Sequence, residues 1–260
     1  MWLFRLCGPF RVEWNGVEIP VGTPQTRVVL ALLVLHANEV VSIGRMSDEL
    51  WGGSPPCSAK PQIHGIISRS RRLLGRERIA TARPGYLLRA NAAELELDVV
   101  RDDVARARRL LATGAVEPGA ARLRSALARW RGPALEELRC ASHVADGLDE
   151  FRLTVLEDRV DADLLLGRSA DLVCELVQLV AEHPLRERLR AQLMTALATS
   201  GRPADALRAY TAYRKTMVEE LGVEPSTELR GLHTRILRGE PPAAGRTPGR
   251  GRTVSRPART

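Results

Sequence analysis

The stretch SAKPQIHGIISRSRRLL, Ser58–Leu74, carries the clearest structural pattern in this chain of 260 residues. Apolar and small residues recur in it at helical spacing, which would bury one side of a helix against a core. These residues are Ala59, Ile63, Ile67, Ser70 and Leu74. The opposite side would carry Arg69, Arg72, Ser68 and His64. The stretch therefore predicts an amphipathic helix with a basic outward face.

A candidate β-hairpin follows this helix directly. Two short β-prone runs between Ile79 and Leu88 flank the turn Arg83-Pro84-Gly85, and proline with glycine between such runs indicates a turn. A helix with an outward row of arginines followed by a hairpin is typical of a winged helix-turn-helix, which places a helix in the DNA major groove.

The residues before this helix predict the remainder of such a domain. Residues 1–21 alternate in polarity around Asn15-Gly16, a hairpin signal that indicates a small antiparallel sheet. Thr23-Pro24 then supplies an N-cap and a first helical residue, and Ser42 could cap a second helix. We therefore predict a winged-helix domain of mixed α and β structure over residues 1–90.

From about Leu95 to Arg238 the pattern is helical throughout and contains an internal repeat. LGRSAD at residues 166–171 returns as SGRPAD at residues 200–205, a separation of 34 positions that is the tetratricopeptide period. A further helix pair, Asp98–Thr113 and Glu117–Arg131, surrounds Gly114. Stacked helix pairs leave a concave surface for another protein. The predicted fold is thus mainly α, with an all-α tetratricopeptide-like domain over residues 95–238 and a disordered basic tail over residues 241–260.

Charge is unevenly distributed along the chain, whose formal net charge is +8. Residues 1–90 carry 12 lysines and arginines against 6 acidic residues, and residues 91–240 carry 22 against 25. The last twenty residues hold 5 arginines and no acidic residue. Positive charge therefore lies on the segment predicted to contact DNA and on the tail. The alternative interpretation is a basic face that only keeps the protein in solution.

Other functional classes find little support. The four cysteines stand far apart, at Cys7, Cys57, Cys140 and Cys174. With no C-x-x-C pair, no histidine at ligand spacing and no catalytic triad pattern, we expect no metal, cofactor or enzymatic activity. The longest apolar run, Val28–Leu35, is too short to cross a bilayer. Without a signal-peptide pattern either, we expect a cytoplasmic, nucleoid-associated protein with no membrane contact.

The predicted DNA-contacting set lies on the basic helix and the hairpin. Its members are Lys60, Gln62, His64, Ser68, Arg69, Arg71, Arg72, Arg83 and Tyr86. The helix arginines suit phosphates, since a guanidinium binds phosphate bidentately. His64 and Gln62 could read base edges, and Arg83 could enter a neighbouring minor groove. For each of these residues the alternative is a solvated surface position.

Three residues are unusual for a recognition helix. Gly65 costs about 1 kcal/mol relative to alanine, and Ser70 stands on the apolar side. Pro61 would be the third helical residue if Ser58 is the N-cap, where its missing N–H is tolerated. These residues leave open a protein-interaction scaffold whose winged helix no longer binds DNA.

The ordered set of motifs resembles the Streptomyces antibiotic regulatory protein family, whose members join an OmpR-like winged helix to a bacterial transcriptional activation domain. Over residues 3–238 the matching stretches are FRLCGPFRV, LLVLHANEVVSIGRMSDELWG, SRSRRLLG, ARPGYLLR, ALARWRGPAL, LEDRVDADLLLGR, HPLRERLRAQLMTAL and EELGVEPSTELRGLH. The chain resembles the small members, without a receiver, ATPase or phosphopeptide-binding module.

The resemblance implies an activator that binds double-stranded DNA at tandem direct repeats upstream of promoters. It also implies contact with RNA polymerase, including its sigma subunit, and control of secondary-metabolite (antibiotic) biosynthesis genes. Family members can bind as pairs on adjacent repeats, so a homodimer on DNA is a further expectation. A repressor that occludes the promoter is the alternative that keeps DNA contact.

Overall fold

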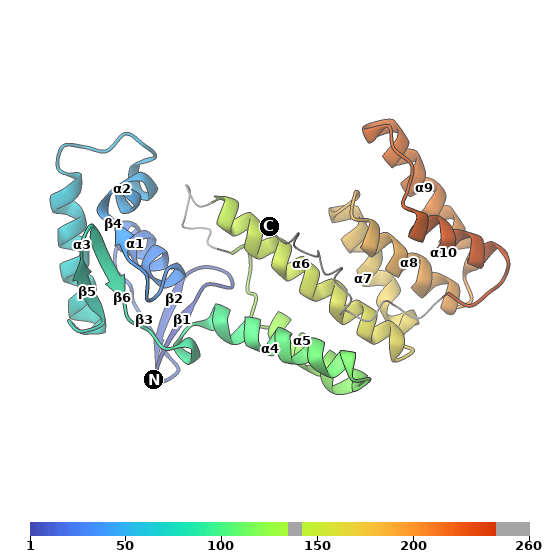
Figure 1. The fold of residues 1–260 in the computed structure, drawn as a ribbon, viewed down its shortest axis with the longest axis horizontal. Coiled ribbons are helices and arrows are strands. Elements are labelled where there is room, and N and C mark those ends of the chain that lie inside the picture. The colour runs from blue at the N-terminus through green and yellow to red at the C-terminus, as the bar shows by residue number, and fades with distance from the viewer. Residues whose placement is uncertain (135–141, 243–260) are drawn as a thin grey trace, which may run out of the picture. The chain divides into compact units, whose positions relative to one another are not determined.

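The computed structural model describes residues 1–134 and 142–242 (Figure 1). They fall into two compact units, Met1–Val104 with Ser125–Leu153 and Ala105–Arg124 with Thr154–Thr260. The division between these units cuts through three helices. It does not test the predicted domain boundary between residues 90 and 95, which stays a prediction. Cys140 and nearly all of the predicted tail, from residue 243 onward, lie outside the described residues.

An antiparallel sheet opens the first unit, with strand order β1 (Trp2–Arg5), β2 (Arg11–Trp14) and β3 (Val17–Ile19). Asn15 and Gly16 connect β2 to β3 with φ values of 50° and 81°. Two central residues with positive φ define the tight turn that suits the twist of a hairpin. The predicted Asn-Gly hairpin is therefore confirmed.

Helices α1 (Pro24–Leu35) and α2 (Ile43–Trp51) begin where their capping residues predict. The Thr23 side chain accepts a hydrogen bond from the Thr26 amide, and the Ser42 side chain accepts one from the Arg45 amide. Each cap satisfies one of the amides that the first helical turn leaves unpaired.

Helix α3 (Ala59–Leu74) has the buried side that its spacing predicts. All five predicted residues are buried, and Ile66 joins them. The Ser70 hydroxyl donates to the Ile66 carbonyl at 3.0 Å, which satisfies this polar group inside the core.

One detail at the start of α3 differs from the prediction. Ser58 occupies the N-cap position but makes no capping hydrogen bond through its side chain. Its hydroxyl accepts instead from the Gln62 side-chain amide at 2.9 Å. A serine hydroxyl can accept from a nearby side chain as readily as from the backbone, so sequence alone could not choose between these partners.

Strands β5 (Ile79–Ala82) and β6 (Gly85–Leu88) form the predicted hairpin beside α3 (Figure 1). Together with the short strand β4 (Val41–Ser42) they make an antiparallel sheet of order β4-β6-β5. Gly85 pairs with Ser42, and a Cβ placed on Gly85 would lie 1.8 Å from the Val41 carbonyl oxygen. The close approach of β4 therefore requires glycine here.

We expect Gly85→Ala to lower the free energy of unfolding by about 3 kcal/mol, because backbone atoms of β4 must move to admit the methyl group. Gly44→Ala is the matched control, since its Cβ would meet nothing closer than 3.8 Å and it lies in α2. Helix propensity predicts that this control is neutral or stabilising by up to about 1 kcal/mol. Urea unfolding followed by circular dichroism measures both, and equal stabilities would contradict the steric argument.

The remaining described chain is helical. Its elements are a 3-10 helix η1 (Ala92–Glu94) and the helices α4 (Glu96–Ala112), α5 (Val116–Leu127), α6 (Ser142–Leu165), α7 (Ser169–Glu182), α8 (Glu187–Thr199), α9 (Pro203–Leu221) and α10 (Thr227–Leu237). Helix α7 packs on α8, and α8 packs on α9.

The turns at Gly114, Gly167 and Gly201 are built alike. Each glycine has positive φ, of 82°, 76° and 75° respectively. Each donates its N–H to the carbonyl three residues earlier, and the next residue donates to the carbonyl five residues earlier. This paired pattern ends a helix with a left-handed residue that favours glycine. The predicted helix pairs around these three glycines are therefore confirmed.

Buried carboxylates of α6 bind arginines from several neighbouring segments of the second unit. These carboxylates are Glu157, Asp158, Asp161 and Asp163. Asp158 accepts from Arg108 of α4 at 2.7 Å, and Asp163 accepts from Arg124 of α5 at 2.6 Å. Arg188 of α8 donates to Asp158 at 2.7 Å and to Asp161 at 2.6 Å. Helix α6 thus connects the helix pairs of this unit through ion pairs that no local sequence pattern predicts.

Candidate nucleic-acid interface

The outward face of α3 presents most of the predicted DNA-contacting residues to solvent. Its exposed members are Lys60, Gln62, His64, Ser68, Arg69 and Arg72, and Arg83 is exposed at the turn between β5 and β6. They are brought to the surface because Ile63, Ile66 and Ile67 fill the core on the opposite side of the helix. Arg71 and Tyr86 differ, since Arg71 is half-buried and Tyr86 is buried.

The exposed cations of this face are not neutralised by any carboxylate in the described part of the chain. In residues 1–134 and 142–242, neither Arg69 nor Arg72 has an ion-pair partner, and the same holds for Lys60 and Arg83. The arginines around α6 differ, because each of them binds a buried carboxylate. Uncompensated positive charge on an exposed helix face attracts polyanions.

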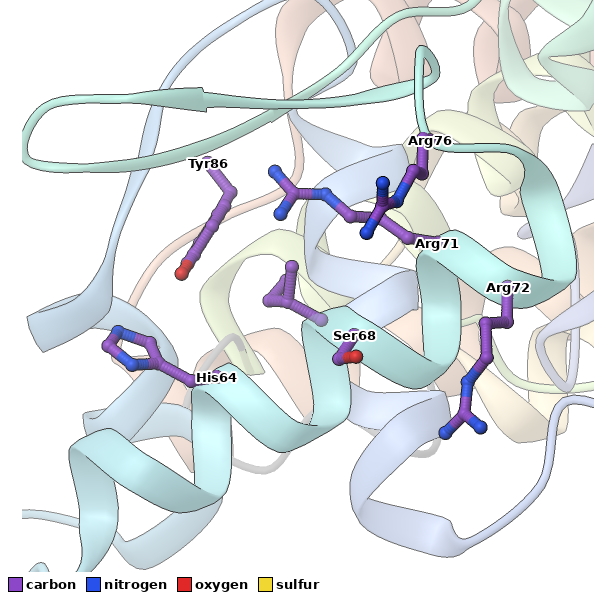
Figure 2. Close-up of a pocket in the computed structure, with 7 residues that line it drawn as sticks. His64, Ser68, Arg71, Arg72, Arg76 and Tyr86 are labelled. Carbon is purple, nitrogen blue, oxygen red and sulfur yellow. The ribbon is translucent and has the colours of Figure 1, made fainter.

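A cavity of about 400 Å³ lies between α3 and the hairpin (Figure 2). It is lined by His64, Ile67, Ser68, Arg71, Arg72, Arg76 and Tyr86. Hydroxyl, imidazole and guanidinium groups thus share one concave surface without a carboxylate among them. Arg76 was not predicted, although its place in RRLLGRER directly after the helix was a signal.

Arg71 is already bound by the hairpin. Its Nε donates to the Ile79 carbonyl oxygen at 2.8 Å, and its Nη2 donates to the Thr81 hydroxyl at 2.8 Å. Its guanidinium carbon lies 5.5 Å from the centre of the Tyr86 ring, within the range of a cation–π contact. Arg71 was predicted as a phosphate ligand, but two of its five N–H donors are used within the protein.

No close contact with the described residues requires glycine at position 65. A Cβ at this position would meet only the Arg69 side chain, at an ordinary contact distance of 3.6 Å. The space beside Gly65 is therefore open on the outward face of α3.

Two other findings concern the described ranges. No group of three or more His, Cys, Asp or Glu side chains is placed there to hold a metal ion. None of the described helices is both long enough and apolar enough to span a membrane.

A winged helix with an exposed basic helix face is an arrangement found in DNA-binding proteins, and paired helices offer surfaces to other proteins. Residues 95–237 match the family of the bacterial transcriptional activator domain. The chain is 38% identical over 251 residues to the regulatory protein DnrI of Streptomyces peucetius, covering 91% of this chain and 92% of that protein. It therefore belongs to the Streptomyces antibiotic regulatory protein family of transcriptional regulators.

Other relatives are longer than this chain. The regulatory protein AfsR of Streptomyces griseus is 38% identical over 240 residues, which cover 91% of this chain but 24% of AfsR. The solved structure of Mycobacterium tuberculosis EmbR in complex with a low-affinity phosphopeptide superposes with a TM-score of 0.89 at 34% identity. That match covers 94% of this chain and 66% of the EmbR chain. The predicted fold, a winged helix followed by a helical domain, is confirmed by this likeness.

Proposed function

We propose that this regulator activates transcription by binding promoter DNA through α3 and the β5–β6 hairpin. The observation that carries the proposal is the exposed pair Arg69 and Arg72 on α3, which has no carboxylate partner among the residues that the structure describes. In winged helices the recognition helix enters the major groove. Arg69 and Arg72 would then contact phosphates, and Arg83 would reach an adjacent minor groove, where negative potential is high.

Base reading is assigned to His64 and Gln62, with Lys60 and Ser68 beside them on the same exposed face. Imidazole and amide groups present the donors and acceptors that base edges require. The open space at Gly65 would let the DNA backbone or a base edge approach α3 closely.

The paired helices of residues 95–238 would provide the protein-facing half of the activator. Helix pairs stacked in this way offer a concave surface for another protein. We assign to this region the contact with RNA polymerase, including its sigma subunit, and the pairing of two copies on tandem direct repeats. The expected targets are genes of antibiotic or other secondary-metabolite biosynthesis.

A footprint of the full chain on the DNA upstream of its own gene cluster tests the binding mode. Two protected direct repeats would support the proposal, and absence of protection at low and moderate salt would contradict it. In vitro transcription from the same DNA with RNA polymerase then shows whether the bound protein activates or represses the promoter. Increased transcript is expected, whereas a decrease would show a repressor.

We expect His64→Ala to reduce the difference in binding free energy between the preferred DNA site and its single-base variants by about 1 to 3 kcal/mol, the range for one base contact. Competition binding with single-base variants of the footprinted repeat measures this preference. Arg72→Ala is the matched control, because loss of a phosphate contact weakens binding to all sequences alike. A uniform loss for His64→Ala would remove His64 from base reading.

A further inference from the structure

Arg71 and Arg72 are neighbours in sequence, but their side chains leave α3 in different directions. Figure 2 shows the Arg71 guanidinium turned toward the hairpin and the Arg72 guanidinium turned away from it. Successive helical residues differ by about 100° around the axis, so the side chains of two adjacent arginines start out in different directions. Arg72 is exposed, whereas Arg71 is half-buried.

The hydrogen bonds of Arg71 reach the strand of the hairpin that has the fewest neighbours. In the sheet order β4-β6-β5, β5 is an edge strand, and edge strands carry unpaired backbone groups. Arg71 donates to the Ile79 carbonyl and the Thr81 hydroxyl of β5, each at 2.8 Å. These two bonds join α3 directly to the outer strand.

The second strand of the hairpin is held by the same guanidinium group. Tyr86 of β6 lies beneath it, with 5.5 Å between the guanidinium carbon and the ring centre. The Tyr86 ring also meets the His64 imidazole edge-on, with ring centres 6.3 Å apart. Arg71 therefore contacts both strands that lead to Arg83, and Tyr86 continues this contact to the base-reading half of α3.

We propose that Arg71 is a positioning residue that fixes the hairpin, and with it Arg83, relative to the base-reading face of α3. This inference rests on the proposed function, because it assumes that α3 and the hairpin contact DNA together. A planar guanidinium with several fixed donors suits this role better than lysine. Holding two DNA-contacting groups in place before binding reduces the entropy lost when the complex forms.

A double-mutant cycle on the footprinted DNA tests the inference. Arg71→Met keeps the aliphatic stem and removes the donors. We expect Arg83→Ala to weaken binding about tenfold in the wild-type background but less than about twofold in the Arg71→Met background. The Arg72→Ala variant is the matched control background. In it, Arg83→Ala should still weaken DNA binding about tenfold, because the contacts of Arg72 and Arg83 are independent.

Footprinting distinguishes a positioning role of Arg71 from a general loss of protein stability, which would weaken protection over the whole site. In Arg71→Met we expect minor-groove protection next to the site to disappear while major-groove protection remains. If Arg71→Met fails to fold, Thr81→Val is the second variant, because it removes one of the two groups that accept hydrogen bonds from Arg71. It should reduce minor-groove protection to a smaller extent.

Equal losses from Arg83→Ala in the wild-type and Arg71→Met backgrounds would overturn the positioning role, as would no effect of Arg83→Ala in the wild type. Both results would leave DNA binding by α3 intact. Failure of the wild-type chain to bind DNA at all would instead overturn the proposed function.

Discussion

We expect Glu96→Ala to lower the free energy of unfolding by about 3 kcal/mol, since it leaves two partly exposed arginines and two buried backbone amides without their acceptor. The Glu96 side chain is fully buried. It accepts from both terminal nitrogens of Arg131, at 2.8 and 3.0 Å, and from Arg5 at 3.2 Å. The Leu6 and Cys7 amides donate to it at 3.1 and 3.0 Å. One carboxylate thus joins the start of α4 to the first sheet and to the segment after α5.

Acid should weaken the same cluster. Burial by itself raises the pKa of Glu96, but the hydrogen bonds from Arg131 and the Cys7 amide, with the charges of Arg131 and Arg5, bring this pKa below its ordinary value. A carboxyl whose pKa is lower in the folded than in the unfolded chain stabilises the fold at pH values above its unfolded-state pKa, which is about 4.3 for glutamate. This contribution is lost as the pH falls through the folded-state pKa. Burial and the Glu96 charge also raise the pKa of the Cys7 thiol to about 12, so Cys7 stays protonated.

Urea unfolding at pH 7 measures the effect of the substitution, and a series of decreasing pH values below the unfolded-state pKa measures the effect of acid. Glu18→Ala is the matched control, because Glu18 pairs with Arg11 on the surface of the same sheet, at 3.3 Å. Exposed pairs contribute at most about 1 kcal/mol. A stability of Glu96→Ala within about 0.5 kcal/mol of the wild type would contradict a structural role for this cluster.

Arg188→Met should have the second large effect, a loss of about 3 kcal/mol that reflects partial exposure of the arginine. Arg188 donates to Asp158 at 2.7 Å and to Asp161 at 2.6 Å, and it lies 3.3 Å from Glu157. Methionine keeps the apolar stem but leaves three carboxylates close together without this cation. Their mutual repulsion then opposes the packing of α8 on α6.

The pH dependence of this loss distinguishes charge from packing. Burial raises the pKa of Asp161, and the Arg188 charge partly offsets this. Without Arg188 the pKa of Asp161 rises further, and an acid with a raised folded-state pKa destabilises the fold increasingly as the pH rises through it. The Arg188→Met penalty should therefore grow between pH 4 and pH 8.

Arg214→Met provides the control for this series. Arg214 pairs with Glu224 at 2.6 Å, but both side chains are about half exposed, so a loss below about 1 kcal/mol is expected. Thermal or urea unfolding across the pH range checks the comparison. A penalty for Arg188→Met that does not change with pH would show that lost packing, rather than unpaired charge, causes it.

Local signals in the sequence were sufficient for most of the fold. Asn15-Gly16 predicts a turn because it tolerates positive φ, and Thr23 and Ser42 predict helix starts because their hydroxyls accept from nearby amides. The spacing of Gly167 and Gly201 predicts the repeated helix pairs. Each of these inferences depends on residues within one turn or one repeat.

The parts that could not be predicted depend on residues distant in sequence. Glu96 meets Arg5 across 91 positions, and no local pattern marks that pair. The acidic residues of α6 could equally have been a solvated helix face. The side chain of Arg71 could have pointed to solvent or to the hairpin, and the choice depends on where β5 lies.

The salt dependence of DNA affinity tests most directly whether α3 contacts duplex phosphates. The logarithm of the binding constant falls linearly with the logarithm of salt concentration, by about one unit of slope for each phosphate contact. For the double substitution Arg69→Ala with Arg72→Ala we predict a slope shallower by about two units than that of the wild type. An unchanged slope in the folded double variant would contradict DNA binding by the outward face of α3.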